Sequence, residues 1–338
     1  MVFALFTAAF GLQHCTKSQL GRLQPSLLPP PNCNVSKSTR CIVQLTEEEI
    51  WSRRPESTDD LVYYQNRGDF AGLGPALDRA FKLTRSSRAP PAVDVVIDGG
   101  ANNGLSTRLF AQAWPSSTVI SLEPGEENYA MLRLHTRALE NVVPLRAALF
   151  GSRDDDSDDV KSESLRVKVK PGAEFSGTVS LAAAGSANIE GFSMPRLMRC
   201  VGIGHVAFLK LDIEGAEFTL LPGSDRGWLR KVSFIYMEMH PSQSDNSKLE
   251  KGLAPLFAAN FSVLTFPELT KRKTFMPPRF WPKGPPFFMD SYFACNPTIG
   301  AKLCADTCAS WRKGSELSCL AVLDGPSSVL ISRLRKAP

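Results

Sequence analysis

Several features that define other classes of protein are missing from this 338-residue sequence. No apolar run suits a membrane-spanning helix, because the uncharged stretch from Val2 to Gln13 is too short to cross a bilayer. There is no stripe of basic residues interleaved with aromatic ones, which argues against nucleic-acid binding. The cysteines lack the spacing of a usual zinc site, and no internal repeat is visible. These absences favour an ordinary globular protein.

Acidic residues are missing from the first part of the chain. Residues 1–46 contain no Asp or Glu, and they open with an apolar segment. This pattern indicates a secretory signal, and a plastid or mitochondrial transit peptide is the alternative. The secretory lumen is favoured because six of the eight cysteines flank the middle of the chain. Asn34 and Asn260 also lie in glycosylation sequons. We therefore expect a lumenal or secreted protein with disulfides.

The middle of the chain differs in pattern from both ends. Thr46–Glu49 fits a capping box and predicts a short helix towards Trp51, and a second helix is expected from Pro75. The sequence divides into a leader and flexible segment (1–45), a helical extension (46–90), a main domain (91–296) and a cysteine-containing tail (297–338). Residues 152–186 interrupt the main domain with acidic residues and a hairpin-like pattern, which indicates a surface insertion.

Strand and helix patterns alternate through the main domain. Strands are predicted at 93–98, 117–123, 141–149, 206–212, 232–240, 261–266 and 287–295, and helices at 105–113, 126–140, 216–221 and 247–260. The final strand has the character of an antiparallel one. This alternation predicts an α/β fold, a doubly wound sheet with helices on both faces.

A glycine-rich turn follows the first of these strands, in the sequence VVIDGGANNG at 95–104. A nicotinamide-binding turn needs glycine at three positions, and Asp98 and Asn103 occupy the first and third. A carboxylate at the first position would repel a pyrophosphate and suits a cationic ligand without phosphate, such as S-adenosylmethionine. Glu123 ends the next strand, where an acid can accept hydrogen bonds from both ribose hydroxyls. The pattern therefore argues against a nicotinamide dehydrogenase.

A second group of polar residues follows the fourth and fifth strands. The fourth strand leads through FLKLDIEGAE at 208–217, and in a doubly wound sheet it lies beside the first. Asp212 is therefore expected near the reactive end of the cofactor. Glu238 and His240 point to one side of the fifth strand, where they would help to deprotonate a hydroxyl or hold a divalent metal. The structural alternative is that Lys210 pairs with Glu214, and that His240 merely ends the strand.

Together these residues resemble the FkbM-type methyltransferases, a family of class I enzymes that use S-adenosylmethionine. The resemblance rests on IDGGANNG (97–104), SLEP (121–124), NVVPLRAAL (141–149), LKLDIEGAEFTLLPG (209–223) and MEMHP (237–241). It implies a Rossmann-like, mostly parallel sheet of seven strands. It also implies O-methylation of a hydroxyl on a sugar, glycan or small-molecule acceptor.

The resemblance also implies roles for individual residues. The expected cofactor-binding residues are Asp98, Gly100, Ala101, Asn102, Gly104, Glu123, Pro124, Ala147 and Ala148. The expected catalytic residues are Asp212, Glu214, Glu238 and His240, with the choice of general base left open, and no metal ligand is assigned. Residues 193–202 (SMPRLMRCVG) lack the Leu-Asp pair that is common in the family before the fourth strand. The alternative function is therefore a methyltransferase-like binding module without turnover. Acceptor specificity is expected in Ser152–Ser186 and Leu269–Pro286, and the oligomeric state is left open.

Overall fold

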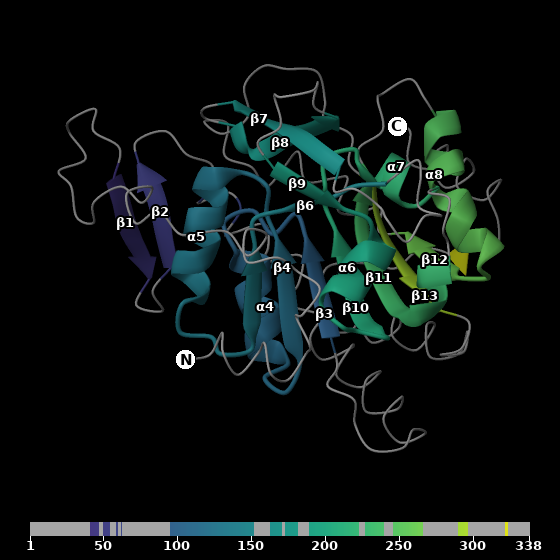
Figure 1. Ribbon diagram of the computed structural model, residues 1–338, viewed down its shortest axis with the longest axis horizontal. Coiled ribbons are helices and arrows are strands. Elements are labelled where there is room, and N and C mark those ends of the chain that lie inside the picture. The colour runs from purple at the N-terminus through teal and green to yellow at the C-terminus, as the bar shows by residue number, and fades with distance from the viewer. Residues whose placement is uncertain are drawn as a thin grey trace.

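The computed structural model describes the main domain and parts of its flanks. The described residues are 41–46, 50–54, 59, 62, 95–151, 163–170, 173–181, 189–222, 227–239, 246–265, 290–296 and 322–323. Their main element is an eight-stranded sheet, and two smaller sheets accompany it (Figure 1). Predictions for the segments around Pro75 and Leu269–Pro286 lie outside the described residues.

Five neighbouring strands form the parallel part of the main sheet. In spatial order they are β11 (Val232–Met239), β10 (Val206–Leu211), β3 (Val95–Gly99), β4 (Thr118–Leu122) and β5 (Val142–Leu145). Beyond β11 lies β13 (Asp290–Cys295), which runs antiparallel to both β11 and β12 (Ser262–Thr265). The mostly parallel α/β fold is therefore confirmed, and so is the antiparallel final strand. A two-residue strand, β14 (Val322–Leu323), adds an eighth that the sequence pattern did not predict.

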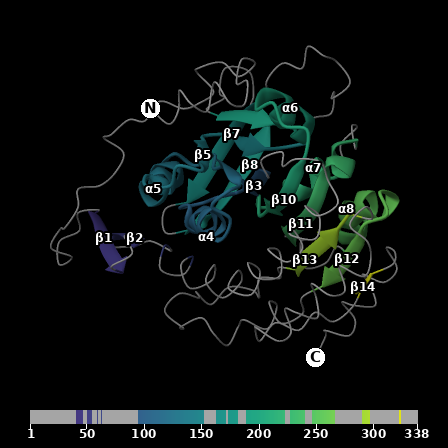
Figure 2. The same cartoon turned by 90° about the horizontal axis from the view of Figure 1, so that it is seen from below.

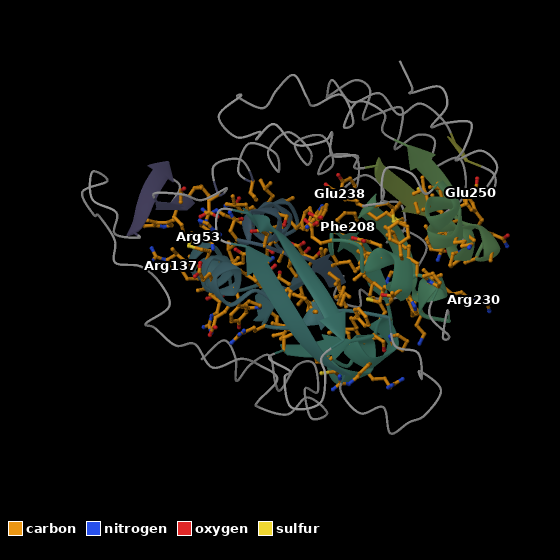
Figure 3. All side chains as sticks on the ribbon, turned by 90° about the horizontal axis from the view of Figure 1, so that it is seen from above. Arg53, Arg137, Phe208, Arg230, Glu238 and Glu250 are labelled. Atoms are coloured by element: carbon orange, nitrogen blue, oxygen red, sulfur yellow. The ribbon has the colours of Figure 1, made fainter. Side chains whose placement is uncertain are left out.

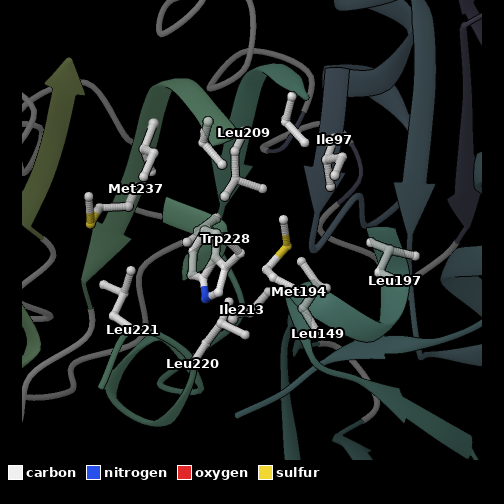
Figure 4. Packing of buried hydrophobic residues seen from close by; sticks show 14 of the residues in the cluster. Ile97, Leu149, Met194, Leu197, Leu209, Ile213, Leu220, Leu221, Trp228 and Met237 are labelled. Atoms are coloured by element: carbon white, nitrogen blue, oxygen red, sulfur yellow. The ribbon is translucent and has the colours of Figure 1, made fainter. Parts of the chain in front are cut away.

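The parallel strands are mainly apolar on both sides because both faces of the sheet are covered, and their charged residues are Asp98, Lys210 and Glu238. Every residue of β3, β10 and β11 is buried. Ile97, Leu209 and Met237 point to one face, where they join the main core with Met194 and Leu197 (Figure 4). On the opposite face, Phe208 packs edge-on against Phe110 and Trp114, with ring centroids 5.3 and 5.7 Å away.

Helices cover these two faces in separate groups. The chain moves one way along the sheet from β3 to β5 and the other way from β10 to β12, so right-handed crossovers put the intervening helices on opposite faces. One group is α4 (Leu105–Ala113) with α5 (Glu126–Thr136), and the other is α6 (Met194–Cys200), α7 (Glu217–Leu220) and α8 (Asn246–Ala258) (Figure 2). A 3-10 helix, η3 (Gly227–Lys231), precedes β11. The four helices predicted in the main domain are present. Helix α6 is an additional one, and its N-cap, Ser193, accepts a hydrogen bond from the Arg196 amide.

A second sheet stands beyond the carboxyl end of β5. It contains β6 (Ala148–Leu149), β9 (Ile189–Phe192), β7 (Glu163–Lys170) and β8 (Ala173–Leu181), in that order (Figure 1). The hairpin expected in the insertion is confirmed by the antiparallel pairing of β7 with β8. The prediction of one strand over 141–149 is wrong, because Ala148 and Leu149 leave the main sheet and pair with β9. The apolar residues of both parts are buried, so the apolar pattern does not reveal the break between β5 and β6.

An N-terminal hairpin docks beside α5. Strands β1 (Cys41–Thr46) and β2 (Ile50–Arg54) pair antiparallel, so the helix predicted from Thr46 towards Trp51 is wrong (Figure 1). The local capping pattern is overridden by tertiary contacts, since Ile50 and Arg53 are buried and the Trp51 amide donates to His135. The hairpin also runs across the boundary predicted at residue 45. No helix in the described part of the chain has the length and apolarity needed to cross a membrane.

Candidate active site

The glycine turn after β3 is shaped by close backbone packing. Gly100 has a φ of +75° and Gly104 a φ of +87°, both in the left-handed region that favours glycine. A Cβ on Gly100 would lie 1.8 Å from the backbone oxygen of Asp212. The amides of Gly100 and Ala101 both donate to the Leu122 carbonyl, at 3.1 and 3.0 Å. These contacts hold the turn directly against the start of the Asp212 loop.

Glu123 binds the backbone on both sides of the predicted cofactor site. One carboxylate oxygen accepts from the Asn102 amide at 2.9 Å, and the other accepts from the Gly125 amide at 2.8 Å. Burial raises the pKa of Glu123 to about 7, against the opposing effect of these hydrogen bonds. The side chain of Asn128 also forms a hydrogen bond with the Glu123 carboxylate. A carboxylate has about four acceptor positions, so these three bonds still leave capacity for a ribose hydroxyl. The position and chemistry of Glu123 therefore fit the role that the sequence suggested.

Asp98 is completely buried beneath the turn. Its Oδ2 atom accepts from the Ser106 hydroxyl at 2.7 Å and from the Thr107 hydroxyl at 2.6 Å, which fastens the start of α4. Its Oδ1 atom lies 3.3 Å from Lys210 Nζ. In this arrangement Asp98 shapes the turn from below, and its direct contact with a cofactor stays a prediction.

Lys210 connects the turn to the predicted catalytic loop. Its ammonium donates to the Gly100 carbonyl at 2.9 Å and lies 3.5 Å from Asp212 Oδ2. Burial opposes its charge, but Asp98, Asp212 and Glu238 together raise the pKa of Lys210 above its ordinary value. Lys210 is thus a permanent buried cation among three carboxylates. The described ion pairs of Lys210 are with Asp98 and Asp212, and they do not include Glu214.

Asp212 and Glu214 sit in a tight loop after β10. The Asp212 amide donates to the Gly99 carbonyl at 3.1 Å, and its side chain is 28% exposed. Glu214 is partly exposed and has a φ of +55°. The loop is held by a residue that sequence reasoning gave no role, Glu217, whose buried carboxylate accepts from the amides of Ile213 and Gly215 at 2.7 and 2.8 Å. The second glutamate of DIEGAE thus shapes the loop that presents the first acid.

The remaining predicted residues are less accessible. Glu238, labelled in Figure 3, is 3% exposed and accepts a hydrogen bond from the Tyr236 hydroxyl at 3.1 Å. It lies on the same face of the sheet as Lys210, because Tyr236 is the partner of Lys210 in the pairing of β10 with β11. Ala147 and Ala148 are buried where β5 gives way to β6, and Pro124 is partly exposed next to Glu123. His240 lies outside the described residues, so its role stays a prediction. No cluster of three or more His, Cys, Asp or Glu side chains in the described segments is suited to hold a metal ion.

S-adenosylmethionine fits the chemistry of this edge. The turn is built from small residues, and the buried Asn102 Oδ1 atom beside it has no hydrogen-bond partner within the protein. Glu123 adds acceptor capacity nearby, and Asp212 offers a partly exposed carboxylate on the neighbouring strand. This set of acceptors suits the hydroxyls of an adenosine ribose and a cationic amino-acid portion without phosphate.

The sheet order and the acid-flanked turn define a class I methyltransferase-type domain. Residues 98–265, about half of the chain, match the family model of the methyltransferase FkbM domain. The protein therefore carries a domain of the FkbM methyltransferase family, which uses S-adenosylmethionine as its cofactor.

One relative is the hexuronic acid methyltransferase AglP of Haloferax volcanii. It is 27% identical over 148 residues, covering 44% of this chain and 56% of that protein. The match thus spans little more than half the length of that relative.

Solved structures with a related arrangement have little sequence in common with this chain. The plantazolicin methyltransferase BpumL in complex with SAH has 10% identity and a TM-score of 0.34, over 70% of this chain and 88% of that one. The N-terminal domain of human METTL16 in complex with SAH has 9% identity and a TM-score of 0.33, over 88% of this chain and 94% of that one.

Proposed function

We propose that this protein transfers a methyl group from S-adenosylmethionine to a hydroxyl of a sugar, glycan or small-molecule acceptor. The observation that carries the proposal is the contact between the glycine turn and Asp212. Gly100 is packed against the Asp212 backbone, and the Asp212 carboxylate is 28% exposed at the same edge. A cofactor seated on the turn would therefore have a carboxylate beside it.

Asp212 is the group that we propose as the proton acceptor. The bound cofactor supplies an electrophilic methyl group on a sulfonium. Asp212 would take the proton of the acceptor hydroxyl while the hydroxyl oxygen forms a bond to the methyl carbon, the bond between that carbon and sulfur breaks, and S-adenosylhomocysteine leaves. Lys210 orients the Asp212 carboxylate from 3.5 Å away. Glu238 is 3% exposed, so its burial favours a supporting role through Tyr236 and Lys210. Alignment of the two reactants then provides most of the acceleration.

A glycan acceptor is supported by the relative AglP, whose name describes a methyltransferase of hexuronic acid. Methylation of a sugar hydroxyl needs a base and space for the sugar at the carboxyl ends of the strands. The four-stranded sheet β6–β9 stands beyond β5 at this edge and is the element that we propose for acceptor selection.

A two-part experiment tests the proposal. Calorimetry with S-adenosylhomocysteine should show binding to the wild type and to Asp212→Asn, and loss of binding in Glu123→Ala. Transfer of labelled methyl groups into a glycan extract of the host should occur with wild type and fail with Asp212→Asn. Glu250→Gln, far away on α8, is the matched control and should retain both properties (Figure 3). Binding without transfer in the wild type, across sugar and small-molecule acceptors, would instead favour a binding module.

We also propose that the protein works in the secretory pathway lumen or is secreted. The acid-free, apolar N-terminus and the two sequons support this, and so do Cys200 and Cys295, which are both disulfide-bonded. Mass spectrometry of unreduced protein from its native host should find these two cysteines oxidised. Free thiols at both positions would contradict the proposal.

A further inference from the structure

We propose that the buried Arg53–Asp59 pair is a positioning device for the cofactor-binding turn. Both residues precede residues 98–265, the part of the chain that matches the family model. The consequence is that docking of the N-terminal segment and binding of S-adenosylmethionine strengthen each other. This inference rests on the proposed cofactor site and adds to it residues that lie outside the family domain.

The pair is held by three hydrogen bonds. Arg53 Nε and Nη2 donate to the two carboxylate oxygens of Asp59 at 2.9 and 2.8 Å, and the Arg53 amide donates to Oδ2 at 2.8 Å. Arg53 is 7% exposed and Asp59 is 1% exposed. Burial alone would raise the pKa of Asp59, but Arg53 outweighs it and keeps the pKa below its ordinary value. Arg53 and Asp59 therefore form a bidentate ion pair, whose two parallel hydrogen bonds fix its geometry.

One branch of the network reaches the glycine turn. Asp59 Oδ1 accepts from the side-chain amide of Asn103 at 3.1 Å. Asn103 is completely buried, and it stands between Asn102 and Gly104. On its other side, the Asn103 carbonyl is bound by His135 Nδ1 at 2.6 Å. The turn is therefore held at Asn103 by two contacts, one from Asp59 to its side chain and one from His135 to its carbonyl.

A second branch reaches Glu123. Arg53 Nη2 donates to Asn128 Oδ1 at 2.8 Å, and the side chain of Asn128 in turn forms a hydrogen bond with the Glu123 carboxylate. A single guanidinium thus supports both the turn and the predicted ribose-binding acid. These two features must keep a fixed separation for one cofactor to contact both.

His135 ties β2 to the same place. Its Nδ1–H donates to the Asn103 carbonyl, and its Nε2 accepts from the Trp51 amide at 2.9 Å. The neutral ring with the proton on Nδ1 satisfies both of these bonds, whereas a charged ring would instead donate from Nε2 to the Trp51 carbonyl, which lies 3.1 Å away. The pKa of His135 is lowered by burial, which is consistent with the neutral form. The hairpin, α5 and the turn therefore share one continuous set of buried hydrogen bonds.

Coupling between two sites is reciprocal, so the unmodified protein offers the first test. Hydrogen exchange of the full chain is measured with and without saturating S-adenosylhomocysteine. The amides of Trp51 and Arg53, which donate to His135 and Asp59, are expected to exchange more slowly with ligand. The α8 amides serve as the unaffected control. Protection of residues 100–105 without protection of β2 would overturn this inference alone, and absence of protection everywhere would overturn the cofactor site as well.

The second test separates positioning from simple stabilisation. Asp59→Asn removes the charge of the pair, and Val263→Ala removes buried methyl groups from β12, far from the turn. Both variants should melt at lower temperature. Asp59→Asn should also raise the KM for S-adenosylmethionine and the Kd for S-adenosylhomocysteine about tenfold, with kcat nearly unchanged. In an Asn103→Ala background the same substitution should add little. Equal Kd values for Asp59→Asn, Val263→Ala and wild type would show that the pair serves stability only.

Discussion

Replacing Lys210 with Met tests the central ionic contact of the site. Lys210 and Asp98 are both almost fully buried, with side-chain exposures of 4% and 0%. Met replaces the unbranched stem of the side chain, one heavy atom shorter, and removes the charge. Asp98 therefore keeps its hydroxyl partners Ser106 and Thr107 and loses its cation. The Gly100 carbonyl also loses its donor.

The expected loss of stability follows from the buried carboxylate. Removing one partner of a buried ion pair costs about 3–5 kcal/mol, because the remaining charge is left without compensation. The contact with Asp212 adds little, since Asp212 is 28% exposed and water screens the pair. Lys210→Met should therefore lower the free energy of unfolding by about 3–5 kcal/mol.

Urea denaturation of the full chain measures this loss, and a double variant isolates its cause. Asp98→Asn combined with Lys210→Met removes the orphaned charge and should recover at least half of the lost stability. Two results would refute the reasoning: a Lys210→Met variant within about 1 kcal/mol of wild type, or a double variant no more stable than the single one. Either would mean that Asp98 does not depend on Lys210 for its burial.

Three further predictions concern the turn and its supports. Burial raises the pKa of Glu123 to about 7, so the ionised form that accepts hydrogen bonds is lost on acidification. By calorimetry, S-adenosylhomocysteine should therefore bind about tenfold more weakly at about pH 6 than at about pH 8. Equal affinities at the two pH values would contradict this prediction. The pKa of His135 is lowered below 6.5, so the unfolded chain takes up a proton that the folded one does not, and the melting temperature should fall as pH drops through that value. His135→Gln should flatten this slope, and identical slopes would exclude His135 as the cause. Gly100→Ala should abolish binding and destabilise the fold by at least about 2 kcal/mol, whereas Gly204→Ala, with no atom within 4 Å of the added Cβ, should do neither; similar melting curves for both variants would argue against the close approach.

The strands and helices of the main domain were predictable because each has a strong local signal. The parallel strands are mainly apolar runs that are buried on both faces, and α4 has the bounds that its pattern predicts. The acids at the carboxyl ends were predictable because strand ends in a doubly wound sheet gather at one edge. Glu123 and Asp212 both lie there, next to the turn.

The predictions that were wrong or incomplete have one physical cause: contacts with residues distant in sequence determine the local structure. The helix expected after Thr46 is a hairpin because β2 finds its partners on α5. The strand expected over 141–149 breaks because β6 pairs with β9. Asn103 looked like a departure from a glycine pattern, and its role depends on Asp59, 44 residues earlier in the chain. Local spacing carries no signal for any of these contacts.

The position of β13 has a consequence for how the protein is made. Strand β13 lies between β11 and β12 in the sheet, yet it is the last of these three strands to be synthesised. A nascent chain that has emerged only to Thr265 contains the parallel strands β3, β4, β5, β10 and β11. It also contains β12, but not yet β13, the strand with which β12 pairs. During that interval the edge of β11, which includes the apolar residues Ile235 and Met237, would be open to pairing with other chains. Folding of the main sheet should therefore be completed by a late insertion, and chains cut short before Asp290 should aggregate.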